Sequence, residues 1–174
     1  MMTTAQAQNE LDRHLAGSRK ARHSQIVSHL MKNLAETKRQ NAELWEVVGL
    51  CHDLDDDVTK SNRQLHGIVT ARWLEDRLPE EALEAIKAHD HRTGIQSHTE
   101  LADALKLADA LAIAAEDAGR EFIAQIHTDS GWQNLSARLA NDRPYLCPII
   151  AELAGRMNLG NSDLVRMFEK APHL

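Results

Sequence analysis

The sequence is poor in cysteine and contains no long apolar run. Its 174 residues include two cysteines, Cys51 and Cys147, which are too few for a disulfide framework and favour a reducing compartment. No apolar stretch approaches the roughly 20 residues that a membrane-spanning helix needs. Asn9, Glu10 and Asp12 interrupt the stretch in which a signal peptide would be apolar. We therefore expect a cytoplasmic protein with no membrane partner.

An excess of positive charge is also missing. The 20 lysine and arginine residues are outnumbered by 26 acidic residues, which gives a net charge of −6. Proteins that bind nucleic acids mainly by neutralising phosphates need the opposite balance. We therefore expect no nucleic-acid polymer as a partner and a small molecule as the ligand.

Sustained alternation of apolar and polar residues, which is typical of strands, does not occur either. Alanine, leucine, glutamate, lysine and arginine dominate instead, and the apolar residues recur at helical spacing. We predict an all-α fold, a single-domain helical bundle over residues 1–174. Its motif-bearing core spans about residues 20–115, and C-terminal helices at about 119–170 complete the bundle.

Capping signals and apolar periodicity give the expected helix boundaries. Ser61 is the predicted N-cap of the fourth helix, Pro79 begins the fifth, and Ser97 with Glu100 has the spacing of a capping box. The predicted helices span about 5–20, 23–38, 41–54, 62–74, a segment from 79, 97–118, 120–127, 132–140, 145–157 and 161–170.

Ten histidines contrast with these absences, and several belong to an ordered set of potential metal ligands. Asp109 lies in the apolar segment 105–111, where an unpaired carboxylate would be costly. Imidazole and carboxylate ligands without thiolates suit iron, manganese, cobalt, nickel or zinc. We therefore predict one or two divalent transition-metal ions as cofactor. The potential ligands, each in or beside a predicted helix, are His23, His52, Asp53, His66, His89, His91 and Asp109.

The order of His23, the pair His52-Asp53, and Asp109 resembles the H…HD…D signature of the HD-domain superfamily of metal-dependent phosphohydrolases. The similarity extends to the neighbouring residues and covers about residues 20–115. The similar segments are 22–27, 49–55, 85–89 and 107–111. The resemblance implies that the four signature residues hold a first metal.

Two further histidines resemble those of superfamily branches that hold two metals. The resemblance implies that His66 and His89 hold the second ion and that Asp53 bridges the two ions through its second oxygen. His91, two residues after His89, is expected to be an exposed side chain rather than a ligand. The apolar positions of Trp45 and Trp73 predict that both lie in the core.

The same resemblance suggests the groups that act on a substrate. Asp53 is the predicted catalytic carboxylate at the metal site, and Asp56, three residues later, is the candidate general acid. The alternative for residues 55–57 is a solvated acidic cluster that ends the helix. Arg22 and Lys87 are the candidate ligands of a substrate phosphate, and the alternative for both is a solvated helix surface.

Taken together, these features predict hydrolysis of a phosphomonoester or phosphodiester of a small metabolite or nucleotide by metal-activated water. One alternative is an HD-type mixed-valent di-iron oxygenase built on the same six ligands. The 20-residue step from His89 to Asp109 is shorter than such oxygenases usually show, which favours the hydrolase. A catalytically silent HD-type regulatory domain is a third interpretation. In each, the apolar stretch 146–153 either caps the core or forms a homodimer face.

Overall fold

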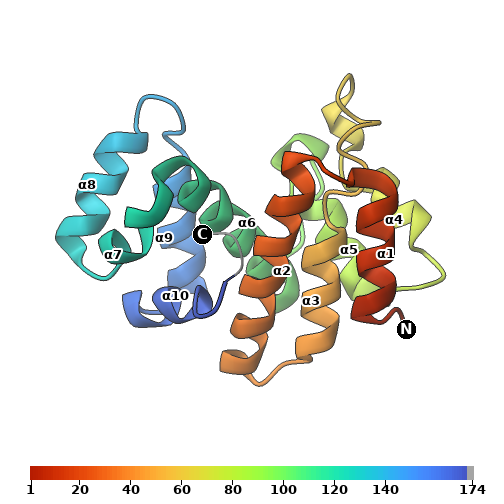
Figure 1. Cartoon of the computed structure of the whole chain (residues 1–174), viewed down its shortest axis with the longest axis horizontal. Coiled ribbons are helices and arrows are strands. Elements are labelled where there is room, and N and C mark those ends of the chain that lie inside the picture. Colours follow the sequence, from red (N-terminus) through yellow and green to blue (C-terminus); the bar gives the residue numbers. More distant parts are fainter. Residues whose placement is uncertain (172–174) are drawn as a thin grey trace.

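The computed structural model describes residues 1–171, apart from the side chain of Arg120, and all regular structure in that range is helical (Figure 1). The all-α prediction is confirmed. The α-helices are α1 (Thr4–Leu15), α2 (Arg19–Lys38), α3 (Ala42–Cys51), α4 (Ile68–Trp73), α5 (Glu80–Ala88), α6 (Glu100–Ala118), α7 (Phe122–Ile126), α8 (Asp129–Leu139), α9 (Leu146–Arg156) and α10 (Asn161–Met167). Three 3₁₀ turns separate some of them: η1 (Arg63–Leu65), η2 (His91–Thr93) and η3 (Gly119–Glu121).

Helix α2 begins earlier than its apolar pattern suggested. The Ser18 hydroxyl accepts a hydrogen bond from the Ala21 amide at 3.1 Å, so Ser18 is the N-cap and Arg19 is the first helical residue. The first helix correspondingly ends at Leu15 rather than near residue 20. His23 therefore lies in the second turn of α2 and not at the start of the helix.

Two other predicted caps are wrong. Residues around Ser61 form turns, and α4 begins only at Ile68 after the 3₁₀ turn η1. Helix α6 is capped by Thr99, whose hydroxyl accepts from the Ala102 amide at 3.2 Å, and not by Ser97. Two hydroxyl residues lie close together before α6, and either could have capped it. Helix α4 has no side-chain cap, and Gly67 precedes its first residue.

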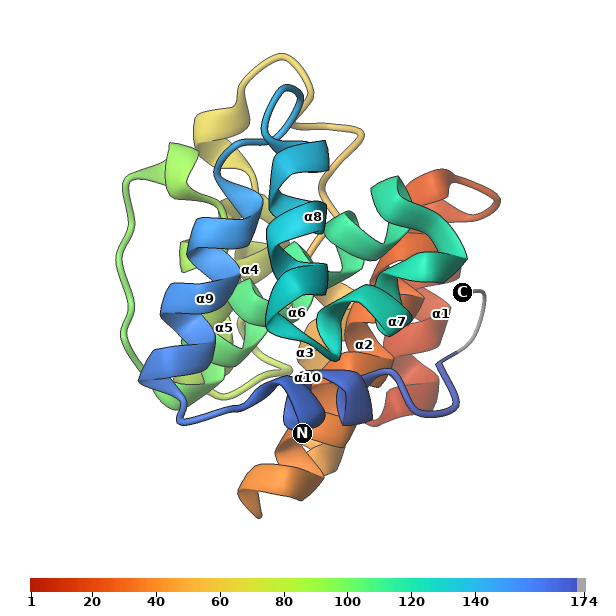
Figure 2. The ribbon, with the colours of Figure 1, turned by 90° about the vertical axis from the view of Figure 1, so that its left-hand side faces the viewer.

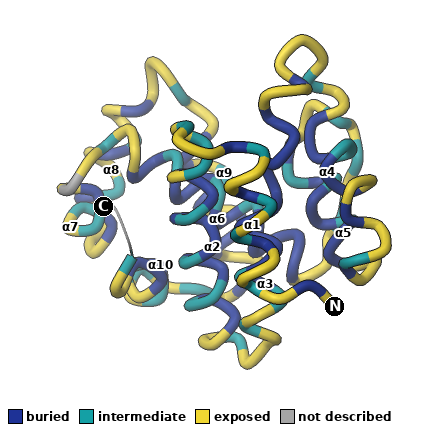
Figure 3. The backbone as a smooth tube through the Cα atoms, turned by 45° about the vertical axis from the view of Figure 1, so that its right-hand side comes forward, coloured by how far each residue is buried: buried dark blue, intermediate teal, exposed yellow. Residues whose placement is uncertain are grey.

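The centre of the molecule is formed by α2, α3 and α6, and α5 packs on α6 (Figure 1). Helices α2 and α3 approach closely because Gly49 has no side chain: a Cβ there would lie 2.5 Å from the Cα of Ser28. This approach brings the end of α3 beside His23. Buried backbone concentrates in the middle of the molecule, while exposed residues follow the loops at its edges (Figure 3).

The C-terminal helices α7–α10 lie at one end of the molecule (Figure 2). Helix α9 packs against α6 and α10 against α2. The rings of Phe122 and Phe168 meet edge to face with their centroids 5.4 Å apart. The buried apolar residues of α7–α10 and of α1–α6 belong to one continuous cluster.

The two tryptophans expected in the core have different environments. Trp45 is buried, as its position on α3 predicted. Trp73 is 40% exposed and stacks on the His14 ring, with centroids 4.4 Å apart, so the core prediction for Trp73 is wrong. Within the described part of the chain, no helix is both long and apolar enough to cross a membrane.

Candidate metal centre

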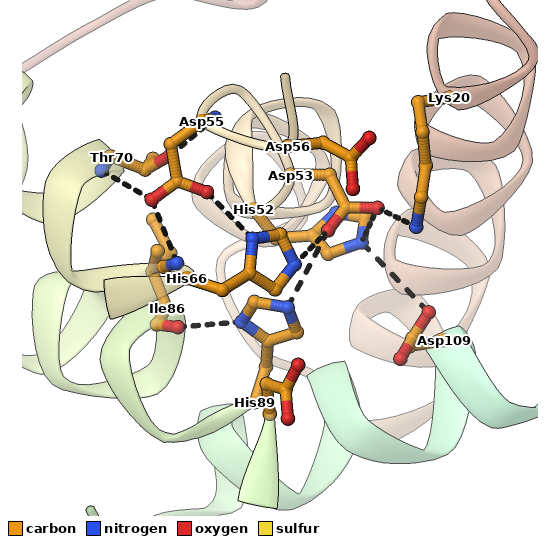
Figure 4. Close-up of polar contacts among 12 residues, drawn as sticks. Lys20, His52, Asp53, Asp55, Asp56, His66, Thr70, Ile86, His89 and Asp109 are labelled. Carbon is orange, nitrogen blue, oxygen red and sulfur yellow. Dashed lines mark hydrogen bonds and ion pairs between the residues drawn. The ribbon is translucent and has the colours of Figure 1, made fainter. Parts of the chain in front are cut away.

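The structure brings all six predicted ligand residues into one cluster, and Figure 4 labels five of them, His52, Asp53, His66, His89 and Asp109. They come from five separate segments of the chain. His23 lies on α2, His52 and Asp53 follow α3, His66 follows η1, His89 follows α5, and Asp109 lies on α6. The side chains of all but Asp109 are almost completely buried, and that of Asp109 is 22% exposed.

The Asp53 carboxylate divides the cluster into two groups. The first group comprises His23, His52 and Asp109: Asp53 Oδ2 lies 3.3 Å from His52 Nε2 and 3.9 Å from His23 Nε2. Asp109 Oδ1 lies 2.9 Å from His23 Nε2 and 3.9 Å from His52 Nε2.

The second group comprises His66 and His89, which lie on the other oxygen of the same carboxylate. Asp53 Oδ1 is 2.8 Å from His66 Nε2 and 3.5 Å from His89 Nε2. One carboxylate therefore presents one oxygen to each group, which is the arrangement that a bridging ligand requires.

Two of the four imidazole rings are oriented by helix ends. His52 Nδ1 lies 2.8 Å from the carbonyl oxygen of Gly49, and His89 Nδ1 lies 2.7 Å from that of Ile86. Carbonyls in the last turn of a helix have no partner within the helix, so they accept the Nδ1 proton of the ring that follows. This hydrogen bond leaves the lone pair on Nε2, which faces the cluster.

The other two rings are oriented by carboxylates. His23 Nδ1 lies 3.3 Å from Glu116 Oε2 on α6, and His66 Nδ1 lies 2.7 Å from Asp55 Oδ1. All four rings thus direct Nε2 to the cluster and Nδ1 to an oxygen acceptor outside it. Such outer partners fix the tautomer and the ring orientation of metal-binding histidines.

Asp55 belongs to the site, although its sequence position did not indicate this. Its carboxylate accepts hydrogen bonds from His66 Nδ1 and from the amides of Gly67 (2.8 Å) and Thr70 (3.0 Å), and it is fully buried. The solvated-cluster interpretation is therefore wrong for Asp55 and correct only for Asp57, which is exposed. Burial acts against ionisation, but these hydrogen bonds outweigh it and lower the pKa of Asp55.

Gly67 allows His66 and His89 to meet. Its φ of +77° lies in the left-handed region, and a Cβ at this position would lie 2.5 Å from the carbonyl oxygen of Ile86. The backbone of segment 63–67 can therefore pass close to the end of α5 only with glycine here. The His66 and His89 rings lie edge to face with centroids 5.0 Å apart.

The acidic groups of the cluster attract positive charge, which the histidines carry in part as protons. Burial lowers the pKa of His52, and its Nε2 is a buried atom without a hydrogen-bond partner among the described residues. Burial opposes protonation of His23 and His66 too, but hydrogen bonds to acidic neighbours raise their pKa values to about 10 and about 9. The imidazoles surrounding Asp53 outweigh its burial and hold its pKa well below the usual range. Cationic partners thus keep this buried carboxylate ionised.

The donor atoms fit the predicted metal ions. Those of His23, His52 and Asp109 all lie within 4.8 Å of one another, and so do those of His52, Asp53 and His89. Nitrogen and carboxylate oxygen donors without thiolates suit first-row transition metals. The unpartnered His52 Nε2, which belongs to both sets, is the atom that a cation would satisfy directly.

The cluster opens into a cleft of about 350 Å³ bounded by α2, the end of α5, α6 and the start of α9. Asp53, His66, His89 and Asp109 lie at its inner end. Its remaining charged lining residues are Lys20, Asp90, His91, Arg92, Lys106 and Arg143. A small ligand in this cleft would therefore contact both the candidate metal ligands and several cations.

Neither predicted phosphate ligand lines this cleft. Arg22 is exposed, and Lys87 forms an ion pair with Glu84 at 2.8 Å. Lys20 lines the cleft instead, and its ammonium lies 2.6 Å from Asp53 Oδ2. Helical spacing could have identified it, because Lys20 lies three residues before His23 and shares its face, whereas Arg22 is turned by about 100°.

The remaining site predictions concern Asp56 and His91. Asp56 is buried and accepts a hydrogen bond from Arg63 Nη1 at 2.7 Å, and it does not line the cleft. The solvated-cluster interpretation is wrong for Asp56 as well. His91 lies at the rim of the cleft with its side chain 90% exposed, as expected for a residue outside the ligand set.

Comparison with protein families gives an independent result. The HD domain family matches residues 21–114, more than half of the chain, and this range contains every predicted ligand. No curated protein and no solved structure matches the chain significantly. The chain therefore belongs to the HD-domain family, a superfamily of metal-dependent hydrolases, as its signature residues predicted.

Proposed function

We propose that this HD-domain protein is a metal-dependent phosphohydrolase that cleaves a phosphate ester of a small metabolite or nucleotide. The observation that carries the proposal is the position of Asp53, which offers one oxygen to each of two imidazole groups at the inner end of a cleft. Membership of the family supports the reaction class. The size of the cleft and its cationic lining residues support a small anionic substrate.

In this proposal the first group, with Asp53 Oδ2, holds one divalent ion, and the second group, with Asp53 Oδ1, holds another. Bound ions of this kind lower the pKa of a water molecule and polarise a phosphate oxygen. The chain's own contribution is to fix the ligands. Asp55 and Glu116 hold the His66 and His23 rings through Nδ1, so that neither ring needs to reorient when an ion binds.

Lys20 is the side chain that we assign to the substrate phosphate. Its ammonium contacts Asp53 Oδ2, and Lys20 also lines the cleft. A short movement of the side chain would therefore take the ammonium from the carboxylate to an anion bound in the cleft. A cation at Asp53 would compete with Lys20 for that oxygen. The displaced ammonium would then be available to a phosphate as a point charge.

We do not propose Asp56 as the general acid. Its ion pair with Arg63 ties the turn after α3 to η1, and it has no place in the cleft lining. We assign it to the support of the loop between His52 and His66 rather than to proton transfer.

Turnover of an aryl phosphate and of a nucleotide panel, each with added Mn²⁺, Co²⁺, Ni²⁺, Fe²⁺ or Zn²⁺, tests the proposal. We expect hydrolysis by the wild type, loss of hydrolysis in His52→Ala, and no change in His127→Ala, which replaces an exposed histidine. A wild type that is inactive with every metal would contradict the proposal and favour the silent regulatory domain.

The same preparation separates the hydrolase from a di-iron oxygenase. Protein purified in air is analysed for iron and for O₂ consumption. We expect phosphate release without O₂ uptake. An iron-containing protein that consumes O₂ and releases no phosphate would replace the hydrolase with the oxygenase.

A further inference from the structure

The outer part of the cleft is built by residues that the sequence analysis did not single out. Its lining includes Lys106, Ala110 and Ile113 of α6 and Leu146 and Ile149 of α9. The two helices pack together, and α9 lies beyond the region matched by the HD domain (Figure 2). The outer cleft thus combines the end of the family region with the C-terminal part of this chain.

Most cations around the cleft have a carboxylate partner. Lys20 lies on Asp53, Arg92 pairs with Asp90, and Arg143 pairs with Asp117 at 2.5 Å. These carboxylates neutralise the three side chains before any ligand binds.

Lys106 differs from these cations. Its ammonium donates to the backbone carbonyl oxygen of Ser97 at 3.1 Å, and no carboxylate oxygen of the described residues lies within 4 Å of it. Its side chain is partly buried, and this burial lowers its pKa, although Asp103 acts in the opposite direction. Asp103 itself pairs with Arg156 at 2.7 Å, so the partly buried Lys106 ammonium has lost hydration without a carboxylate in contact with it.

The position of Lys106 relates this charge to the metal centre. Lys106 precedes Asp109 by three residues, so both lie on the cleft-facing side of α6. Ala110 and Ile113 of α6, with Leu146 and Ile149 of α9, add apolar side chains to the lining. A bound molecule would therefore meet the metal ligands, an apolar lining, and a cation that no carboxylate contacts.

We propose that the substrate carries a second anionic group, a carboxylate or a second phosphate, and that Lys106 binds it. This proposal rests on the phosphohydrolase function, which supplies the first phosphate, and narrows its substrate to a small dianionic or more highly charged ester. The cleft volume of about 350 Å³ lies near the lower end of the range for small-molecule sites, so the two anionic groups are joined by a short carbon frame.

The test measures binding with ligands that the enzyme does not hydrolyse. Metal-loaded protein is titrated calorimetrically with phosphonates of increasing chain length, whose C–P bond is stable to ester hydrolysis. Each alkylphosphonate is compared with the phosphonocarboxylate and the bisphosphonate of equal length. The last two arms distinguish a carboxylate from a second phosphate. Inorganic phosphate serves as the probe of the inner site alone.

Three variants are compared with the wild type. Lys106→Met removes the charge, Lys106→Arg retains it, and Lys32→Met removes an exposed lysine that pairs with Glu46 on the surface. At one chain length or more we expect the wild type and the last two variants to bind a doubly anionic ligand at least about tenfold more tightly than its alkyl counterpart. In Lys106→Met we expect that preference to disappear while binding of inorganic phosphate is unchanged.

The outcomes separate this proposal from the hydrolase proposal. Absence of a preference at every chain length in the wild type, or a preference that survives in Lys106→Met, overturns the role of Lys106. Hydrolysis without any preference removes only the second anionic group. A preference without hydrolysis retains the anion site and removes the proposed reaction.

Discussion

The two ligand groups on Asp53 are held in place by different parts of the fold. His23, His52 and Asp109 of the first group lie on or directly after α2, α3 and α6, the helices that form the centre of the molecule. His66 of the second group follows a three-residue 3₁₀ turn, and its ring is held by Asp55. Helix packing thus positions the first group, whereas a few hydrogen bonds and one glycine position His66.

This difference indicates that the two groups can be disturbed separately. Apolar packing distributes its stabilisation over many contacts, so no single polar substitution removes it. A turn held by one buried carboxylate depends on that side chain, so a single substitution can displace it. A substitution at His52 should disturb both groups, substitutions at Asp55 and Gly67 should disturb the second group, and one at Lys20 should affect neither.

The largest effect is expected for His52→Ala. His52 is a ligand of the first group, and its donor atom also lies within 4.8 Å of those of Asp53 and His89, so its loss removes a ligand of the first ion and disturbs the neighbouring second site. We expect activity to fall by more than the roughly 100-fold that loss of an outer-shell contact costs. Elemental analysis and turnover check this, with circular dichroism for the fold. Activity equal to that of the His127→Ala control would show that the cluster is not the catalytic site.

Asp55→Asn is expected to disturb the second group alone. An amide in place of the carboxylate leaves an NH₂ group facing N–H donors, which costs about 1–3 kcal/mol of stability and releases the His66 ring. We expect affinity for the second ion to fall by about 10–100-fold while the first ion stays bound. Metal titration followed by calorimetry measures both sites.

Asp57→Asn provides the matched control, because Asp57 is exposed and, among the described residues, forms an ion pair only with Lys60. It should bind both ions as the wild type does. Loss of both ions together in Asp55→Asn would contradict the separation of the two groups.

Gly67→Ala tests the close approach of the segment that carries His66 to the end of α5. A left-handed alanine costs about 1–2 kcal/mol by itself. Gly17→Ala, at φ +71° with open space around it, shares only that cost. We expect Gly67→Ala to lower the free energy of unfolding further, because its Cβ meets the carbonyl of Ile86, and to weaken the second ion site. Urea denaturation of both variants gives the difference, and equal values would argue against a tight approach.

Lys20→Met is expected to have the smallest effect. Loss of a charged contact to the substrate phosphate should raise KM by about tenfold without lowering the metal content, because Lys20 is not a ligand and competes with the ion for Asp53 Oδ2. Steady-state kinetics and elemental analysis measure these two quantities, with Lys32→Met as the control. An unchanged KM would remove Lys20 from phosphate binding.

The sequence was sufficient for the helical architecture and for the six residues of the cluster. Regular helices carry or precede most of these residues, so apolar periodicity and the order of His and Asp predict them together. The contact of Asp55 with His66 spans 11 residues of turns and a left-handed glycine, and no linear spacing encodes it. The role of Lys106 depends on which charges surround it in three dimensions, and composition does not contain that information.

Metal content per chain tests the central claim, that Asp53 joins two ion sites, most directly. Wild-type protein, Asp55→Asn and His52→Ala are loaded with the ion that supports the fastest turnover, desalted and analysed for metal and protein. The account predicts a ratio near two for the wild type, near one for Asp55→Asn and lower still for His52→Ala. A wild-type ratio of one or zero would contradict it.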